Sequence, residues 1–265
     1  MDRTARDAIR AVWVGMIGVM LALSGCATSV SEAPAVSQVV GKAEQTAMTP
    51  DEALARLAEG NQRFASGKSL RRDYPAQMKA TATGQYPFAA VLSCIDSRSS
   101  PEIVFDQGIG DLFVARIAGN YAPTGIIGSL EYATKVAGAK LIVVLGHTEC
   151  GAIKGACDDV DMGNLTSVIQ ALRPAVDEVK DVPGERTSAN KKFVLAVTEA
   201  NVRRTVAHLR AQSPILRELE HSGQIKIVGA MHDIATGQVT FFNWHDDAEQ
   251  SRRSADQSAP AYARN

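Results

Sequence analysis

The chain has few aromatic residues, no excess of charge of either sign and only four cysteines. Of its 265 residues, 5% are Phe, Trp or Tyr, and the formal net charge is -1. The near-neutral charge gives no electrostatic reason to expect a nucleic-acid partner, and the scarcity of aromatics argues against a base-stacking surface. A hydrophobic content of 45% is sufficient for one domain with a sizeable core.

The apolar segment nearest the N-terminus is short and typical of a signal peptide. Three arginines in the first ten residues precede an apolar stretch over residues 11–23, which is too short to span a bilayer comfortably. Residues 23–26, Leu-Ser-Gly-Cys, resemble the processing box of bacterial lipoproteins. We expect a signal peptide over residues 1–25 and lipidation of Cys26, with the exported protein anchored to a bacterial membrane and facing the periplasm. An ordinary signal peptide with an incidental cysteine is the alternative.

Apart from Cys26, the cysteines are Cys94, Cys150 and Cys157. An odd number does not suit a disulfide framework, although an exported protein lies in an oxidising compartment. We interpret Cys157 as a small buried hydrophobic residue rather than a functional thiol.

Composition divides the chain into three parts after the signal peptide. Residues 26–46 are rich in Ala, Ser, Val and Glu without sustained periodicity, which predicts a flexible tether. Residues 47–246 predict one folded domain, and the polar residues 247–265 predict a disordered tail. The first helix of the domain begins with a predicted capping box formed by Thr49 and Glu52.

Apolar runs alternate with helical patterns through the domain. The sequence predicts strands at 88–94, 111–117, 140–146, 226–231 and 239–244. It predicts helices at about 50–64, 74–81, after Pro101, at 125–136, from near Cys150, and at 164–180 and 189–211. Such alternation is typical of βαβ units. We therefore predict an α/β fold with a mostly parallel central sheet of about five strands, an antiparallel edge strand and flanking helices.

Two short polar segments follow two of these predicted strands. Residues 93–98 read Ser-Cys-Ile-Asp-Ser-Arg, and residues 147–151 read His-Thr-Glu-Cys-Gly. The carboxyl ends of parallel strands are where open α/β sheets place their sites. Cys94, His147 and Cys150 form a soft donor set that suits zinc, and three protein ligands leave a fourth position for water or substrate. The spacing thus favours a catalytic rather than a structural zinc site.

The first segment also carries a carboxylate and a guanidinium. Asp96 could accept a hydrogen bond from water near the metal, and Arg98 could keep Asp96 ionised and fixed by a two-point hydrogen bond. A simple salt bridge within the loop is the alternative interpretation.

These motifs resemble the Cys-x-Asp-x-Arg and His-x-x-Cys-Gly motifs of β-class carbonic anhydrases. The resemblance extends over about residues 50–246 and includes segments 113–120 and 128–133. It implies a zinc lyase that hydrates CO₂ reversibly to bicarbonate and a proton by zinc-hydroxide attack. One Zn²⁺ per chain would be bound by Cys94, His147 and Cys150.

The resemblance also implies roles for residues around the metal. Asp96 and Arg98 would be the catalytic pair, and the backbone N–H of Gly151 would lie near the substrate. Gln85 would reach the substrate across a dimer interface, so the resemblance implies a homodimer or a larger homo-oligomer. Phe113 and Tyr132 would line the substrate pocket, although the sequence alone would place both in the core. Ala118 occupies a position where the family has valine, which could change the width of the pocket.

Three other functions remain open at this point. A related enzyme that hydrolyses CS₂ or COS would share these motifs. A catalytically silent, zinc-stabilised binding protein displayed on a membrane would share the metal ligands and tolerate loss of Asp96. A redox protein would use a Cys94–Cys150 disulfide and need no metal, but the odd number of thiols argues against it.

Overall fold

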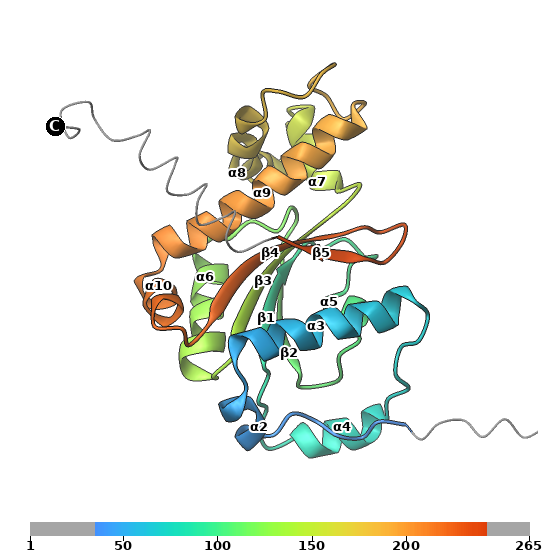
Figure 1. Cartoon of the computed structure of the whole chain (residues 1–265). Coiled ribbons are helices and arrows are strands. Elements are labelled where there is room, and N and C mark those ends of the chain that lie inside the picture. Colours follow the sequence, from blue (N-terminus) through green and yellow to red (C-terminus); the bar gives the residue numbers. More distant parts are fainter. Residues whose placement is uncertain (1–34, 243–265) are drawn as a thin grey trace, which may run out of the picture. The chain divides into compact units, whose positions relative to one another are not determined.

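The computed structural model describes residues 35–242, which contain a single five-stranded sheet. The strand order is β2-β1-β3-β4-β5 (Figure 1), with β1 at Ala89–Ser93, β2 at Leu112–Arg116, β3 at Leu141–His147, β4 at Lys226–His232 and β5 at Val239–Phe241. Strands β1 to β4 pair in parallel, and β5 pairs antiparallel to β4 at one edge. The predicted fold class is confirmed, including the antiparallel edge strand.

Within residues 35–242, seven helices lie where the sequence predicts helices, and the structure has two more, at residues 42–47 and 214–221. The helices are α2 (Lys42–Ala47), α3 (Pro50–Ala65), α4 (Tyr74–Thr81), α5 (Pro101–Val104), α6 (Thr124–Glu131), α7 (Gly151–Cys157), α8 (Leu165–Glu178), α9 (Lys191–Gln212) and α10 (Pro214–His221). The predicted capping box is present, since the Thr49 hydroxyl accepts from the Glu52 N–H and the Glu52 carboxylate accepts from the Thr49 N–H. The helix predicted at 125–136 is α6 followed by a π-helical turn, η1 (Tyr132–Val136).

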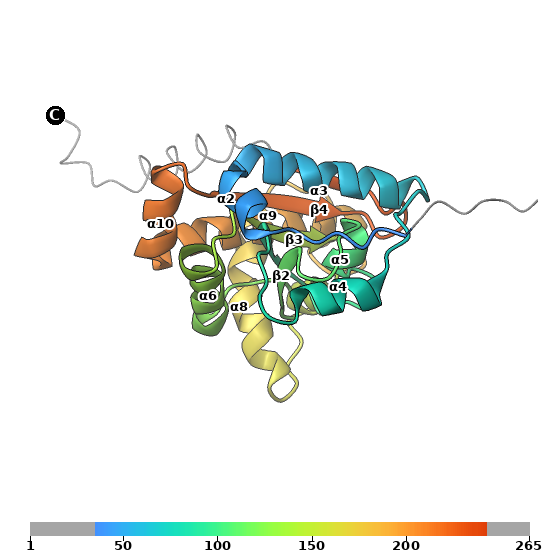
Figure 2. The same ribbon diagram turned by 90° about the horizontal axis from the view of Figure 1, so that it is seen from below.

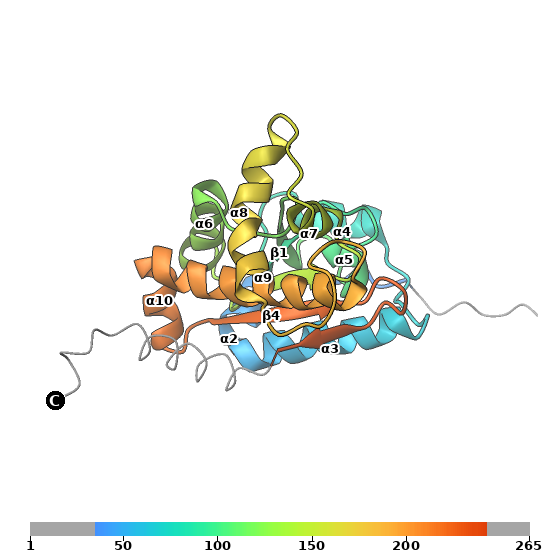
Figure 3. The same cartoon turned by 90° about the horizontal axis from the view of Figure 1, so that it is seen from above.

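Helices cover both faces of the sheet. Alternate strand residues point to opposite faces, so each face has its own set of contacts. Ala90 and Leu92 of β1 pack with residues of α6, α9 and α10, whereas Ala89 and Val91 pack with residues of α3. Figures 2 and 3 show α3 on one side of the sheet and α6 and α9 on the other. The strands are therefore buried on both faces, as their continuous apolar runs indicate.

The structure differs from the expected tether over residues 35–46. The N–H of Val36 donates to the carbonyl of Arg71, and the carbonyl of Val36 accepts from the N–H of Asp73. Val40 is buried, and Gln45 at the start of the domain donates to the carbonyl of Pro87 at 2.7 Å. This segment is fixed by contacts with distant residues, which composition and local periodicity do not encode.

The predicted signal peptide, Cys26, residues 26–34 of the tether and the tail 247–265 lie outside the described residues. Between residues 35 and 242, no helix combines the length and apolar character needed to cross a membrane.

Candidate metal centre

Three potential metal ligands converge at the carboxyl ends of β1 and β3. Cys94 directly follows β1, His147 is the last residue of β3, and Cys150 precedes α7 as its N-cap residue. Their ligand atoms all lie within 4.8 Å of one another, and the two sulfur atoms are 4.0 Å apart. All three residues are buried. The structure thus brings together the three residues that the sequence predicts as zinc ligands.

The sheet and one tight turn account for this convergence. Strands β1 and β3 are neighbours with Ser93 opposite Leu145, so the residues that follow both strands lie close together. Between His147 and Cys150 the chain turns through Glu149, whose φ of 58° is in the left-handed region. Non-glycine residues seldom adopt this conformation, and they do so most often at functional sites.

The imidazole of His147 is oriented for metal binding. Its Nδ1 lies 2.9 Å from the carbonyl oxygen of Thr148, which assigns the proton to Nδ1. Its Nε2 is buried and has no hydrogen-bond partner within the described chain. A metal ion would satisfy this atom, and a backbone carbonyl on the opposite nitrogen is a common way to orient a histidine ligand.

The two thiols share a proton in the absence of metal. The hydrogen bond from the Cys150 thiol is the main reason that the pKa of Cys94 falls to about 4, with a smaller contribution from the N–H of Gly119. That N–H lies 3.3 Å from the Cys94 sulfur. The same sharing, together with burial, raises the pKa of Cys150 far above its usual range. A metal ion would replace the shared proton and stabilise both thiolates, so the donor set fits zinc.

Asp96 and Arg98 form the predicted two-point ion pair. Arg98 donates through Nε to Oδ1 of Asp96 at 2.9 Å and through Nη2 to Oδ2 at 2.7 Å. The backbone N–H of Arg98 also donates to Oδ1. These bonds, above all those from the guanidinium, hold the pKa of Asp96 well below its usual range. The carboxylate is therefore ionised at neutral pH, and its oxygens serve as acceptors.

Arg116 holds the segment that carries both Cys94 and Asp96, although the sequence alone assigns it no role. From the end of β2, its Nε donates to the carbonyl of Cys94 at 2.9 Å and its Nη2 to the carbonyl of Asp96 at 2.6 Å. The position of an arginine at the end of a predicted strand is the only sequence signal for this role.

A second contact fixes the far end of the Asp96–Arg98 turn. The hydroxyl of Ser99 lies 3.0 Å from Nδ1 of His232, the last residue of β4, and both side chains are buried. His232 is opposite His147 in the β3–β4 pairing. Burial is the main reason that the pKa of His232 falls to about 4, so this imidazole is neutral at physiological pH.

The predicted pocket residues are not all near the metal ligands within one chain. Gly151 directly follows Cys150, but Gln85 precedes β1 and so lies at the opposite end of that strand from Cys94. Phe113 and Tyr132 pack edge to face with ring centroids 6.2 Å apart, and Tyr132 is 55% exposed. They line a cavity of about 500 Å³ along β2, the edge strand opposite β5.

Fold and site together define an α/β protein with a buried Cys-His-Cys cluster that could hold a metal ion and a carboxylate–guanidinium pair beside it. The sequence profile described as carbonic anhydrase matches residues 89–239. "Carbonic anhydrase 2" of Mycobacterium tuberculosis is 36% identical over 196 residues, which cover 72% of this chain and 91% of the relative. The carbonic anhydrase of Pseudomonas aeruginosa is 34% identical over 181 residues, 64% of this chain and 81% of that protein.

Solved β-class structures share the fold. The β-carbonic anhydrase CcaA superposes with a TM-score of 0.56 and 27% identity, covering 72% of this chain and 87% of that one. The Coccomyxa β-carbonic anhydrase superposes with a TM-score of 0.59 and 24% identity, covering 78% and 99%. The chain belongs to the carbonic anhydrase family, in its β class, and is an enzyme of that family.

Proposed function

We propose that this protein catalyses the reversible hydration of CO₂ to bicarbonate and a proton, with one zinc ion per chain. The observation that carries the proposal is that the buried Cys94–His147–Cys150 cluster lies next to the Asp96–Arg98 pair. Asp96 follows Cys94 by two residues. Zinc, when bound, acts as a Lewis acid that makes a water molecule reactive at neutral pH.

The ligand residues prepare the site for this ion. Nε2 of His147 and the sulfur atoms of Cys94 and Cys150 would bind the metal, while Thr148 keeps the imidazole in the required tautomer. The N–H of Gly119 would continue to donate to the Cys94 thiolate, a geometry that φ of 75° at this glycine permits.

Asp96 orients the reacting water rather than accepting its proton. Its lowered pKa makes the carboxylate a weak base at neutral pH, so it holds a hydrogen bond and leaves the proton for solvent or buffer. Arg98 fixes the direction of that hydrogen bond by occupying both carboxylate oxygens from one side. Arg116 and Ser99 hold the backbone of the turn that carries the pair.

A second copy of the chain would complete the substrate pocket. Gln85 is exposed and remote from its own metal ligands, and the edge of β2 presents the half-exposed pair of Phe113 and Tyr132. Exposed apolar surface beside an unpaired strand edge is typical of an interface. We propose a homodimer or larger homo-oligomer in which Gln85 reaches the partner's site. A tetrameric β-carbonic anhydrase is known from Sordaria macrospora.

The proposed location is the periplasmic side of a bacterial membrane, with Cys26 as the lipidated anchor. The support is the sequence of residues 11–26. Mass spectrometry of the N-terminal peptide from cells would test it, and an unmodified Cys26 in the exported protein would contradict it.

The decisive experiment is stopped-flow CO₂ hydration from pH 6.5 to 9, with zinc quantified in the same sample. A chain that begins at Ala27 retains every residue of the described fold. About one zinc per chain with chelator-sensitive hydration would support the proposal. Full zinc occupancy without hydration would refute it, and assays with CS₂ and COS, followed by a search for a binding role, would come next.

A further inference from the structure

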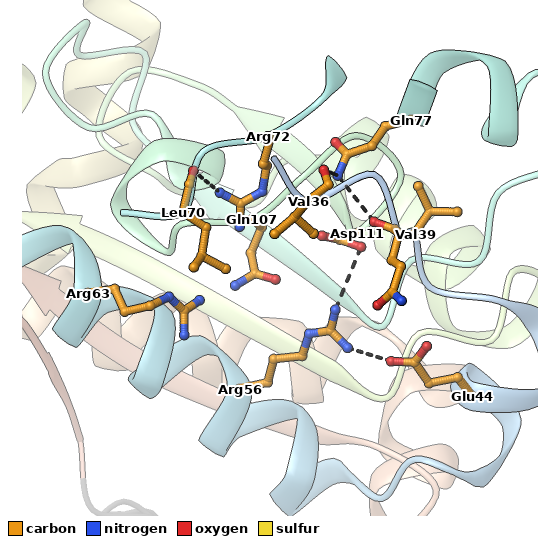
Figure 4. A pocket seen from close by; sticks show the side chains of 11 residues that line it. Val36, Val39, Glu44, Arg56, Arg63, Leu70, Arg72, Gln77, Gln107 and Asp111 are labelled. Atoms are coloured by element: carbon orange, nitrogen blue, oxygen red, sulfur yellow. Dashed lines mark hydrogen bonds and ion pairs between the residues drawn. The ribbon is translucent and has the colours of Figure 1, made fainter. Parts of the chain in front are cut away.

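A polar cavity, separate from the one lined by Phe113 and Tyr132, lies beside the start of β2. It has a volume of about 280 Å³ and is enclosed by residues 36–39, α3, α4 and the loop before β2 (Figure 4). Asp111 in its wall directly precedes β2, whereas Cys94 follows the parallel neighbouring strand β1. Asp111 and the metal centre are therefore separated by the length of the strands, and no metal ligand lines this cavity.

One end of the cavity carries a net positive charge. Arg63 donates through Nε to Oδ2 of the buried Asp106 at 2.6 Å, and Arg72 pairs with Oδ1 of the same carboxylate. Two guanidiniums against one carboxylate leave a formal charge of +1. Within residues 35–242, the side chain of Arg63 forms no other hydrogen bond, so both of its terminal nitrogens can bind an anionic group that enters the cavity.

The other end carries a net negative charge. Arg56 pairs with Glu44 at 2.6 Å, and its second terminal nitrogen forms a long ion pair with Oδ1 of Asp111 at 3.9 Å, which is beyond hydrogen-bond distance. Asp111 is 6% exposed; its Oδ2 accepts from the N–H of Gly108, but its Oδ1 has no hydrogen-bond partner in the described chain. A buried carboxylate oxygen without a donor is costly, so a cationic donor would bind there favourably.

We propose that this cavity binds a small zwitterion of the amino-acid type, with its carboxylate on Arg63 and its ammonium group on Asp111. A simple anion would leave Oδ1 of Asp111 without a hydrogen-bond donor. A simple cation would leave the terminal nitrogens of Arg63 without an acceptor. Figure 4 shows Arg56 and Arg63 entering from the same helix, with Gln107 and Asp111 on the facing wall. The volume lies just below that of pockets for drug-sized ligands, which suits a molecule of a few heavy atoms.

Isothermal titration of the zinc-loaded protein with L-alanine, β-alanine and γ-aminobutyrate would test the proposal, because these zwitterions separate the two charges by increasing lengths. We expect saturable binding of at least one, and binding about tenfold or more weaker for propionate and propylamine, which each carry one of the charges. No saturable binding of any zwitterion up to about 20 mM would overturn the proposal.

Variants locate the binding. Asp111→Asn keeps the size of the side chain and an oxygen for the Gly108 N–H, and we expect it to weaken binding about tenfold, as Arg63→Gln would. Arg63→Lys retains the positive charge and should weaken binding less than Arg63→Gln. Arg173→Gln, which removes an exposed ion pair with Asp159, is the matched control. All four should hydrate CO₂ like the parent, and unchanged binding in both Asp111→Asn and Arg63→Gln would overturn the proposal.

Discussion

Arg116 donates a hydrogen bond to the backbone carbonyl of Cys94 at 2.9 Å, and so connects the edge strand β2 to a candidate metal ligand. The same guanidinium bonds the carbonyl of Asp96. A single side chain thus holds the backbone that carries both the candidate ligand Cys94 and the carboxylate of Asp96.

Replacement of Arg116 by Met should therefore reduce activity without unfolding the protein. We expect kcat/KM for CO₂ hydration or zinc affinity to fall about 10- to 100-fold, the usual effect of losing a residue that orients a metal site. Stopped-flow assays and zinc titration would measure both quantities. Arg173→Met is the control, because Arg173 forms only exposed ion pairs. Equal activity of Arg116→Met and the parent would show that the loop holds its position without this residue.

Asp96→Asn should separate an enzyme from a zinc-stabilised binding protein. The amide keeps the shape but loses the charge that pairs with Arg98, so we expect full zinc occupancy and hydration reduced about 100-fold or more. Because the pKa of Asp96 is lowered, its protonation should not appear in the activity profile of the parent between pH 6.5 and 9. Unchanged hydration in the variant would exclude a catalytic role for this carboxylate.

Stability should depend on His232 below neutral pH. Its pKa is about 4 in the fold and about 6.5 in an unfolded chain. Between these values only the unfolded chain binds the proton, so the stabilisation is complete above pH 6.5 and is lost as the pH falls toward 4.

Urea unfolding of the zinc-loaded protein at several pH values between 7.5 and 4.5 would measure this dependence. The His232→Gln side chain can still form a hydrogen bond with Ser99, and this variant should show a weaker dependence of stability on pH. Replacement of the exposed His208 should leave the dependence unchanged. The same pH dependence in His232→Gln and the parent would assign the effect to other groups.

Removal of zinc should make one cysteine selectively reactive. The hydrogen bond with Cys150 holds the pKa of Cys94 well below its usual range, whereas burial is the main cause that raises the pKa of Cys157 to about 11. Thiolate is the nucleophile, so iodoacetamide at pH 6 should label Cys94 after chelation and leave Cys157 unmodified. Peptide mass spectrometry would identify the labelled site. Faster labelling of Cys157 than of Cys94 would contradict this expectation.

A charge at the exposed aromatic pair should disrupt the proposed oligomer. Tyr132 is 55% exposed and contacts Phe113 at the edge of the sheet, so Tyr132→Asp would place a carboxylate in the proposed interface. Sedimentation velocity should show a smaller species than the parent, with activity reduced because Gln85 of the second copy is lost. Met162→Asp, at an exposed position in the loop before α8, is the matched control. A parent that is monomeric would contradict the proposal directly.

Local sequence patterns predicted most of the fold and the three residues that form the candidate metal cluster. A local stretch of sequence is enough to predict the helix start at the Thr49–Glu52 capping box and the buried strands β1 and β3. Each of these features depends on residues that are close together in the chain. Cys94 and His147 each stand at the end of such a run, and parallel pairing then brings them to the same edge of the sheet.

Only the tertiary structure decided the remaining features, because they are contacts between segments far apart in the chain. The order β2-β1-β3-β4 places Arg116 beside Cys94 and His232 beside Ser99, and neither pairing has a local signal. Residues 35–46 have a composition typical of a linker, yet backbone pairing at Val36 fixes them to the domain. The charge separation between Arg63 and Asp111 likewise arises only where α3 meets the loop before β2.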